Sequence, residues 1–184
     1  MQLGDRSGTV RVANSLNWAR LVQGDIPETD AALRETLSDA EQLGSAEEVA
    51  MAEANLARYH VYRGEPAPGL PHLSESLELV VPLRHKAGTA YVLDIGAEAA
   101  ALLGAFERSV HLFAAADAIR EAIGAPLVAS LRERNASNLE KLKDRLGDEA
   151  FRNAWSHGAA MSLDQAVAEL GEVTRSPLAS PTYG

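Results

Sequence analysis

The sequence predicts an all-α fold, a right-handed stack of three antiparallel helical hairpins followed by a C-terminal helical cap. The chain is rich in alanine and leucine, and aromatic residues make up only 5% of it. Such a composition favours helices, because alanine and leucine lose little conformational freedom in them. Glycines also recur every 40 residues between segments of helical length, and 184 residues suit one domain with a sizeable core.

The repeat is marked by Gly24, Gly64 and Gly104. Each is expected to end one helix in the left-handed conformation and to turn the chain back. A large apolar residue follows nine positions after each glycine and should fill the groove between the paired helices: Leu33, Leu73 and Phe113. Eight positions before the glycines stand Leu16, Leu56 and Gly96, so the third repeat departs from leucine.

The hairpins are expected to occupy residues 1–125. Their helices are predicted over 9–23 and 27–43, 46–63 and 67–83, and 86–103 and 106–123. Asp25 is a suitable N-cap for the second helix. Pro71 is expected in the first turn of the fourth helix, whereas Pro82 should bend or end it.

Residues 126–173 are predicted to form capping helices that do not follow the repeat. A polar helix over about 127–146 should end at Gly147, and a short helix then carries Phe151 and Trp155 as anchors of the cap. Ser162 and Gln165 have the spacing of a capping box that begins the last helix. Residues 174–184 contain two prolines and lack periodicity, which predicts a flexible tail.

Charge and hydropathy restrict the partners and the cellular compartment that we expect for the chain. Its net charge is −9, which disfavours direct binding of nucleic acid by this segment. It has no cysteine, so disulfides and thiol chemistry are excluded. No apolar run approaches the roughly 20 residues that span a bilayer, and the N-terminus lacks a signal-peptide pattern. We therefore expect a cytoplasmic protein without a membrane partner.

The glycines and the side chains around them resemble the tetratricopeptide (TPR) pattern, lengthened from its usual repeat of about 34 residues. Segments 112–127, 146–151 and 161–167, together with Ala154, Trp155 and Gly158, are similar to a recurrent C-terminal signature. It resembles that of the TPR-like arm of large bacterial transcriptional regulators with a signalling ATPase module, of the LuxR and AfsR type. Similar arms occur beside adenylate-cyclase and Ser/Thr-kinase modules.

In that family the ATPase module lies upstream, and a helix-turn-helix domain follows the signature in the LuxR-type members. This sequence has no Gly-x-x-x-x-Gly-Lys-Ser/Thr loop for phosphate, and it continues only briefly after the last predicted helix. Nucleotide hydrolysis and DNA binding are therefore not carried over to it. The resemblance implies a fragment of such a regulator, or a stand-alone relative.

Helical spacing from the glycines predicts a binding groove on the concave face, which is lined by the first helix of each hairpin. An aromatic residue, an arginine and carboxylates there would suit a partner protein, a peptide or a small effector. The expected groove residues are Arg11, Asn14, Trp18, Met51, Arg58, Tyr91, Asp94 and Glu98. The alternative for Trp18 and Tyr91 is that they fill gaps between adjacent helices.

These features favour a protein-interaction or effector-sensing scaffold of a transcriptional regulator. The alternative is a stand-alone TPR-like adaptor with no regulatory output of its own, and self-association is possible for either. An enzyme is not expected: only Asp94 and Glu98, one helical turn apart, could share a proton. The five histidines include no pair three or four residues apart, so neither a metal nor another cofactor is expected.

Overall fold

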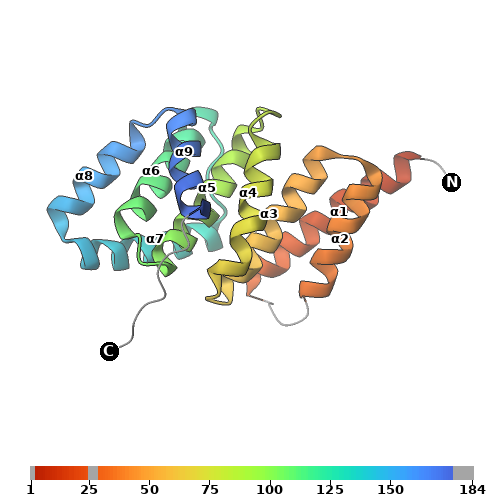
Figure 1. The fold of residues 1–184 in the computed structure, drawn as a ribbon, viewed down its shortest axis with the longest axis horizontal. Helices are drawn as coiled ribbons and strands as arrows, with labels where there is room; N and C mark the ends of the chain where they lie inside the picture. Colours follow the sequence, from red (N-terminus) through yellow and green to blue (C-terminus); the bar gives the residue numbers. More distant parts are fainter. Residues whose placement is uncertain (1–2, 25–28, 176–184) are drawn as a thin grey trace.

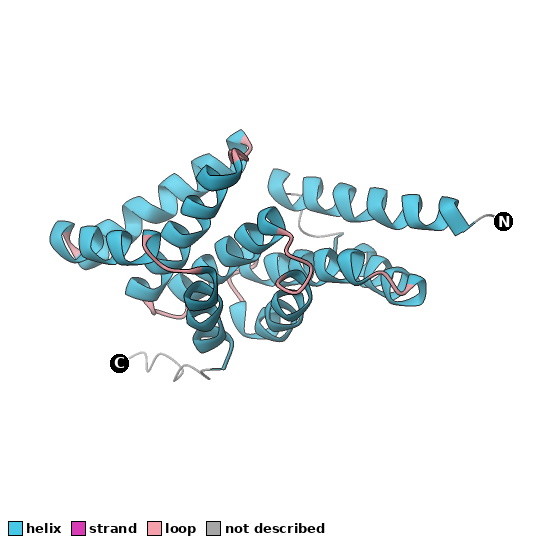
Figure 2. Ribbon diagram, turned by 90° about the horizontal axis from the view of Figure 1, so that it is seen from above, coloured by secondary structure: helices cyan, strands magenta, loops and turns pink. Residues whose placement is uncertain are grey.

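The computed structural model describes residues 3–24 and 29–175. Within these ranges the chain is all helical and has no strand, which confirms the predicted fold class (Figure 1; Figure 2). The helices are α1 (Leu3–Gln23), α2 (Thr29–Leu43), α3 (Ala46–Tyr62), α4 (Pro66–Val80), α5 (Lys86–Leu102), α6 (Phe106–Ile123), α7 (Ala129–Leu146), α8 (Asp148–Ala159) and α9 (Leu163–Arg175).

Consecutive helices pack in pairs along an elongated stack. The pairs α1–α2, α3–α4 and α5–α6 each lie side by side, as the repeat predicts (Figure 1). The first helices of the hairpins are also neighbours, because α3 packs against both α1 and α5. These first helices therefore share one face of the stack.

The turn within each hairpin has the predicted glycine geometry. Gly24, Gly64 and Gly104 have φ angles of 83°, 75° and 81°, which lie in the left-handed region that glycine adopts without steric cost. A second series, not predicted from the sequence, marks the turns that follow the second helices. Gly44 and Gly124 adopt φ of 70° and 65° there, whereas Arg84 takes the corresponding position with φ of 54°.

The large apolar residue of each repeat is buried, as predicted: Leu33, Leu73 and Phe113 all lie in the core. The position eight residues before the glycines is less regular. Leu56 is buried, but Leu16 is 49% exposed.

Glycine stands at position 96, where the first two repeats have leucine, because a side chain of another helix fills the space there. A Cβ atom built at Gly96 would overlap the side chain of Leu170, which is itself fully buried. Leu170 belongs to α9, and α9 packs across α4, α5 and α6. The apolar volume at this position thus comes from the cap rather than from the repeat.

Three predictions about helix ends need correction. Helix α4 begins at Pro66, so Pro71 lies inside the helix rather than in its first turn, and α4 ends at Val80 before Pro82, as predicted. Helix α1 begins at Leu3, earlier than expected, and α7 begins at Ala129, slightly later. The expected N-cap Asp25 lies outside the described residues.

Helices α7, α8 and α9 follow the three hairpins. Phe151 and Trp155 stack with ring centroids 6.2 Å apart and pack against the core. The Ser162 N–H donates to Gln165 Oε1 at 2.8 Å, and the Gln165 N–H donates to Ser162 Oγ at 3.2 Å, which completes the capping box. Helix α9 extends through Arg175, so the boundary expected at residue 173 falls two residues early. The remaining tail, 176–184, lies outside the described residues.

In the part of the chain that the structure describes, we find no helix with the length and apolar character required to cross a bilayer.

Candidate functional site

The predicted groove residues lie on the first helices of the three hairpins, but they differ in accessibility. Arg11 is exposed. Half-buried side chains belong to Trp18, Met51 and Tyr91. Buried side chains belong to Asn14, Arg58, Asp94 and Glu98. Half of the set is therefore held within the protein, and each of its four side chains makes at least one polar contact there.

Arg58 on α3 forms the centre of this arrangement. Its side chain is only 1% exposed, and Nη1 lies 3.2 Å from Glu98 Oε1 and donates to the Tyr62 hydroxyl at 2.9 Å. The guanidinium also lies over the rings of Tyr91 and Tyr62, at 4.5 and 5.3 Å from their centroids. These cation–π contacts stabilise a charge that water does not reach.

The electrostatic environment keeps Arg58 charged. Burial alone would lower its pKa, but the acidic groups around it, Tyr91, Tyr62 and Glu98, outweigh that effect and raise the pKa. Arg58 Nε and Nη2 have no hydrogen-bond partner within the described protein. The buried charge therefore depends on one carboxylate and on two aromatic faces.

Glu98 joins three helices. Its Oε1 pairs with Arg58 of α3, and its Oε2 accepts from Arg134 Nε of α7 at 2.6 Å. The guanidinium of Arg134 in turn lies 3.8 Å from the ring centroid of Tyr62. One buried carboxylate on α5 thus connects the second hairpin to the first helix of the cap.

Asp94, one turn earlier on α5, is bound separately. Arg120 Nη1 of α6 donates to its Oδ2 at 2.6 Å, and Asn135 Nδ2 of α7 donates to its Oδ1 at 3.2 Å. Burial raises the pKa of Asp94 to about 6, although Arg120 and Arg58 act in the opposite direction. Asp94 and Glu98 therefore engage different arginines, an arrangement that does not favour a shared proton.

The polar contacts continue toward α1. Tyr91 donates its hydroxyl hydrogen to Asn55 Oδ1 at 3.1 Å, and Asn55 Nδ2 donates to the Asn14 carbonyl at 3.2 Å. Asn14 Nδ2 reaches Glu48 Oε2 at 2.9 Å, and Arg11 pairs with the same carboxylate at 3.1 Å. Burial raises the pKa of Tyr91 to about 12, so this hydroxyl stays a donor at neutral pH.

The predicted groove therefore contains a polar network that runs from α1 to α7. Helix α7 lies against this face, because Arg134 and Asn135 reach the buried carboxylates of α5. Spacing from the glycines did place the residues on one face. It did not reveal that the cap helix covers part of that face.

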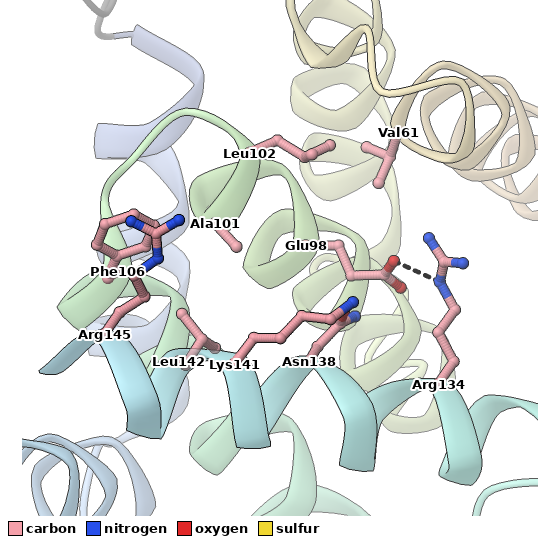
Figure 3. Close-up of a pocket in the computed structure, with 10 residues that line it drawn as sticks. All are labelled: Val61, Glu98, Ala101, Leu102, Phe106, Arg134, Asn138, Lys141, Leu142 and Arg145. Atoms are coloured by element: carbon pink, nitrogen blue, oxygen red, sulfur yellow. Dashed lines mark hydrogen bonds and ion pairs between the residues drawn. The ribbon is translucent and has the colours of Figure 1, made fainter. Parts of the chain in front are cut away.

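A cavity of about 260 Å³ lies beside the network, between α5 and α7 (Figure 3). Its apolar walls come from Val61, Ala101, Leu102, Phe106 and Leu142. Its polar lining comes from Glu98, Arg134, Asn138, Lys141 and Arg145. Of the residues predicted from the sequence, only Glu98 contributes to this cavity.

The α7 residues of the cavity were missed because the repeat does not extend to them. Their spacing nevertheless carried a signal: Arg134, Asn138, Lys141 and Arg145 are separated by four, three and four residues, which places them on one helix face. The sequence alone did not say which neighbouring helix this face meets.

The described residues include no group of three or more His, Asp or Glu side chains arranged to hold a metal ion. The site consists instead of paired charges, two tyrosines and a small cavity open to solvent at one side. This chemistry suits the binding of a small molecule between α5 and α7.

The chain is similar to part of three mycobacterial proteins that carry the provisional name HTH-type transcriptional regulator, two from strains of Mycobacterium tuberculosis and one from Mycobacterium bovis. It is 29% identical to each over 112 residues, which is 61% of this chain. The matched region is 13% of the length of each relative, so the chain corresponds to a small part of them. No protein-family model matches the chain, and no solved structure matches it.

Proposed function

We propose that this chain is a protein-interaction and effector-sensing TPR-like scaffold that belongs to a bacterial transcriptional regulator of the LuxR or AfsR type. The observation that carries the proposal is the similarity to a region of HTH-type transcriptional regulators. The stack of helical hairpins supports it, because such stacks offer extended faces for partners. In this proposal DNA binding and nucleotide hydrolysis belong to other parts of the regulator.

The cavity between α5 and α7 is the proposed effector site. A molecule in it would contact Leu102 of α5 and Lys141 of α7 at once, so its affinity would depend on how these helices are spaced. An effector that prefers one spacing shifts the population toward it, by as much as its affinities for the two states differ. Helix α7 is the element through which that preference would reach the rest of the regulator.

The scaffold is proposed to act by binding rather than by catalysis. Glu98 lines the cavity, Asp94 lies one turn earlier on α5, and each carboxylate is held by an arginine at 2.6 Å. A general acid or base needs a proton that it can exchange with substrate. These two ion pairs favour a structural role, and the proposed partners are a protein, a peptide or a small effector in the cytoplasm.

The test is made in the organism that carries the gene, with the complete protein. Glu98→Gln together with Arg134→Gln removes the ion pair between α5 and α7. Lys86→Met on an exposed part of α5 serves as the matched control. We expect the double variant to change the transcript levels of a defined set of genes, while the control leaves them unchanged.

A transcript profile identical to wild type, with the double variant present at normal protein levels, would overturn the regulatory proposal. If the same variant instead lost a co-purifying partner without any change in transcription, the stand-alone adaptor would be favoured.

A further inference from the structure

The cavity between α5 and α7 has a lining that is partly apolar and partly cationic. Leu102, Phe106 and Leu142 form an apolar side, and Leu102 is half-exposed, so part of this surface faces solvent. Figure 3 shows Lys141 and Asn138 pointing from α7 toward the space beneath Leu102 and Val61. An occupant would therefore meet hydrocarbon from Leu102, Phe106 and Leu142 and also cationic and amide groups of α7.

The cations of the cavity are not equally engaged. Arg134 is paired with Glu98, as described above. Lys141 makes no ion pair or hydrogen bond with any described residue, and neither does the Asn138 side chain. Arg145 has no carboxylate partner in the described part of the chain and lies over the ring of Phe106, 5.7 Å from its centroid.

The balance of charge around the cavity is positive although the whole chain is acidic. Three cationic side chains and one carboxylate line it, and both oxygens of that carboxylate, Glu98, are already bound by arginines. The net charge of the chain is −9, so a local surplus of unpaired cations is not a consequence of composition. It is a feature of the face that α7 turns toward α5.

We propose that this cavity binds a small amphipathic organic anion. Its apolar body packs against Leu102, Phe106 and Leu142, and its anionic group lies near Lys141, with Asn138 as an additional donor. Arg145 adds positive charge at the Phe106 end of the cavity. A volume of about 260 Å³ limits the occupant to a small molecule. The inference rests on the proposed function only for the role of the ligand as an effector; the binding itself stands on the lining of the cavity.

The test uses octanoate, with octanol and octylammonium as probes of the same apolar length, each titrated into the full chain and followed by amide chemical shifts in NMR spectra. We expect octanoate to bind at least about tenfold more tightly than octanol, the factor that corresponds to one charge-assisted hydrogen bond. Octylammonium should bind more weakly still. The shifts should concentrate at the end of α5 and along α7.

Two sets of variants locate the interaction. Lys141→Met together with Arg145→Met should abolish the advantage of octanoate over octanol, because both side chains are exposed and their loss leaves the apolar wall in place. Lys86→Met is the matched control, since it lies about 20 Å away along the same helix as Ala101. Ala101→Phe should fill the cavity and weaken octanoate and octanol alike.

Equal affinity for octanoate and octanol, or no binding of octanoate, would overturn the inference. So would retention of the octanoate advantage in the Lys141→Met and Arg145→Met variant. These outcomes are separate from the transcript test: octanoate binding without any transcriptional change would remove the regulatory role and leave the anion site intact. A variant that unfolds is recognised from its amide spectrum, and Ala101→Phe then tests the cavity independently.

Discussion

Arg58 and Glu98 occupy equivalent positions of consecutive repeats and form an ion pair of 3.2 Å in which both side chains are almost completely buried. Such a pair contributes little net stability, because desolvation of the two charges offsets their attraction. Its effect lies in specificity. An arginine that is buried without a carboxylate is costly, so α3 and α5 are favoured only in the register that brings the two residues together.

The first prediction concerns this pair. Glu98→Gln should destabilise the fold by about 3 kcal/mol, because it leaves the buried charge of Arg58 without its carboxylate. Replacing both residues, with Arg58→Met and Glu98→Leu, should cost markedly less than the sum of the two single changes. Urea denaturation of the wild type, Arg58→Met, Glu98→Leu and the double variant gives the coupling energy. Additive losses would show that the two charges do not depend on each other.

The second prediction concerns pH. The pKa of Asp94 is raised from 3.8 to about 6 in the folded chain, so the folded state binds this proton more tightly than the unfolded state. The contribution of Asp94 to stability is therefore fully present below pH about 3.8 and is lost as pH rises through about 6. Asp94→Asn removes the titration and keeps the shape of the side chain.

The stability of the wild type relative to Asp94→Asn should accordingly fall between pH 4 and pH 7, by as much as about 3 kcal/mol. Urea denaturation of both proteins at several pH values measures this difference. The other carboxylates are the same in the two proteins, so their contributions to the pH dependence cancel. A carboxyl carbon resonance of Asp94 that titrates with a midpoint below 4 would contradict the raised pKa.

The periodicity of the sequence predicts the helical repeat and the proximity of two of the residues described above. A spacing of 40 residues places Arg58 and Glu98 at the same position of neighbouring helices, so their proximity follows from the repeat. It also predicts the burial of Leu33, Leu73 and Phe113, because one face of each helix must meet its partner. The role of Arg58 and Glu98 in binding a partner stays a prediction.

The contribution of the cap could not be obtained in the same way. Helix α7 lies outside the repeat, so no spacing relates Arg134 to Glu98 or Asn135 to Asp94. Whether a carboxylate in a groove is open or covered depends on such long-range contacts. Periodicity therefore places Arg58 and Glu98 on neighbouring helices but gives no information on the α7 side chains that line the cavity.

The third prediction concerns the turn at Arg84, which holds φ at 54° where the equivalent turns have Gly44 and Gly124. The left-handed conformation costs an L-residue about 1–2 kcal/mol, and substitution by glycine removes this cost. Glycine also increases the conformational entropy of the unfolded chain, which offsets part of the stabilisation. Arg84→Gly should therefore stabilise the chain by about 0.5–1 kcal/mol in thermal or urea unfolding.

The control for this prediction is Arg132→Gly, which removes the same charge from an exposed position inside α7. Glycine inside a helix costs about 1 kcal/mol, so this variant should lose stability. A loss of stability in both variants would mean that Arg84 is held by interactions of its side chain rather than strained by its backbone.

The fourth prediction concerns the packing of Gly96 against Leu170. Gly96→Leu restores the residue found at positions 16 and 56, but its side chain would collide with Leu170. Leu170→Ala alone should cost about 2–5 kcal/mol, because it empties a fully buried site. Gly96→Leu combined with Leu170→Ala should recover part of that loss, since the new leucine fills the space that the old one vacates. Chemical denaturation of the single and double variants measures the recovery, and a double variant less stable than either single one would refute this exchange of volume between α5 and α9.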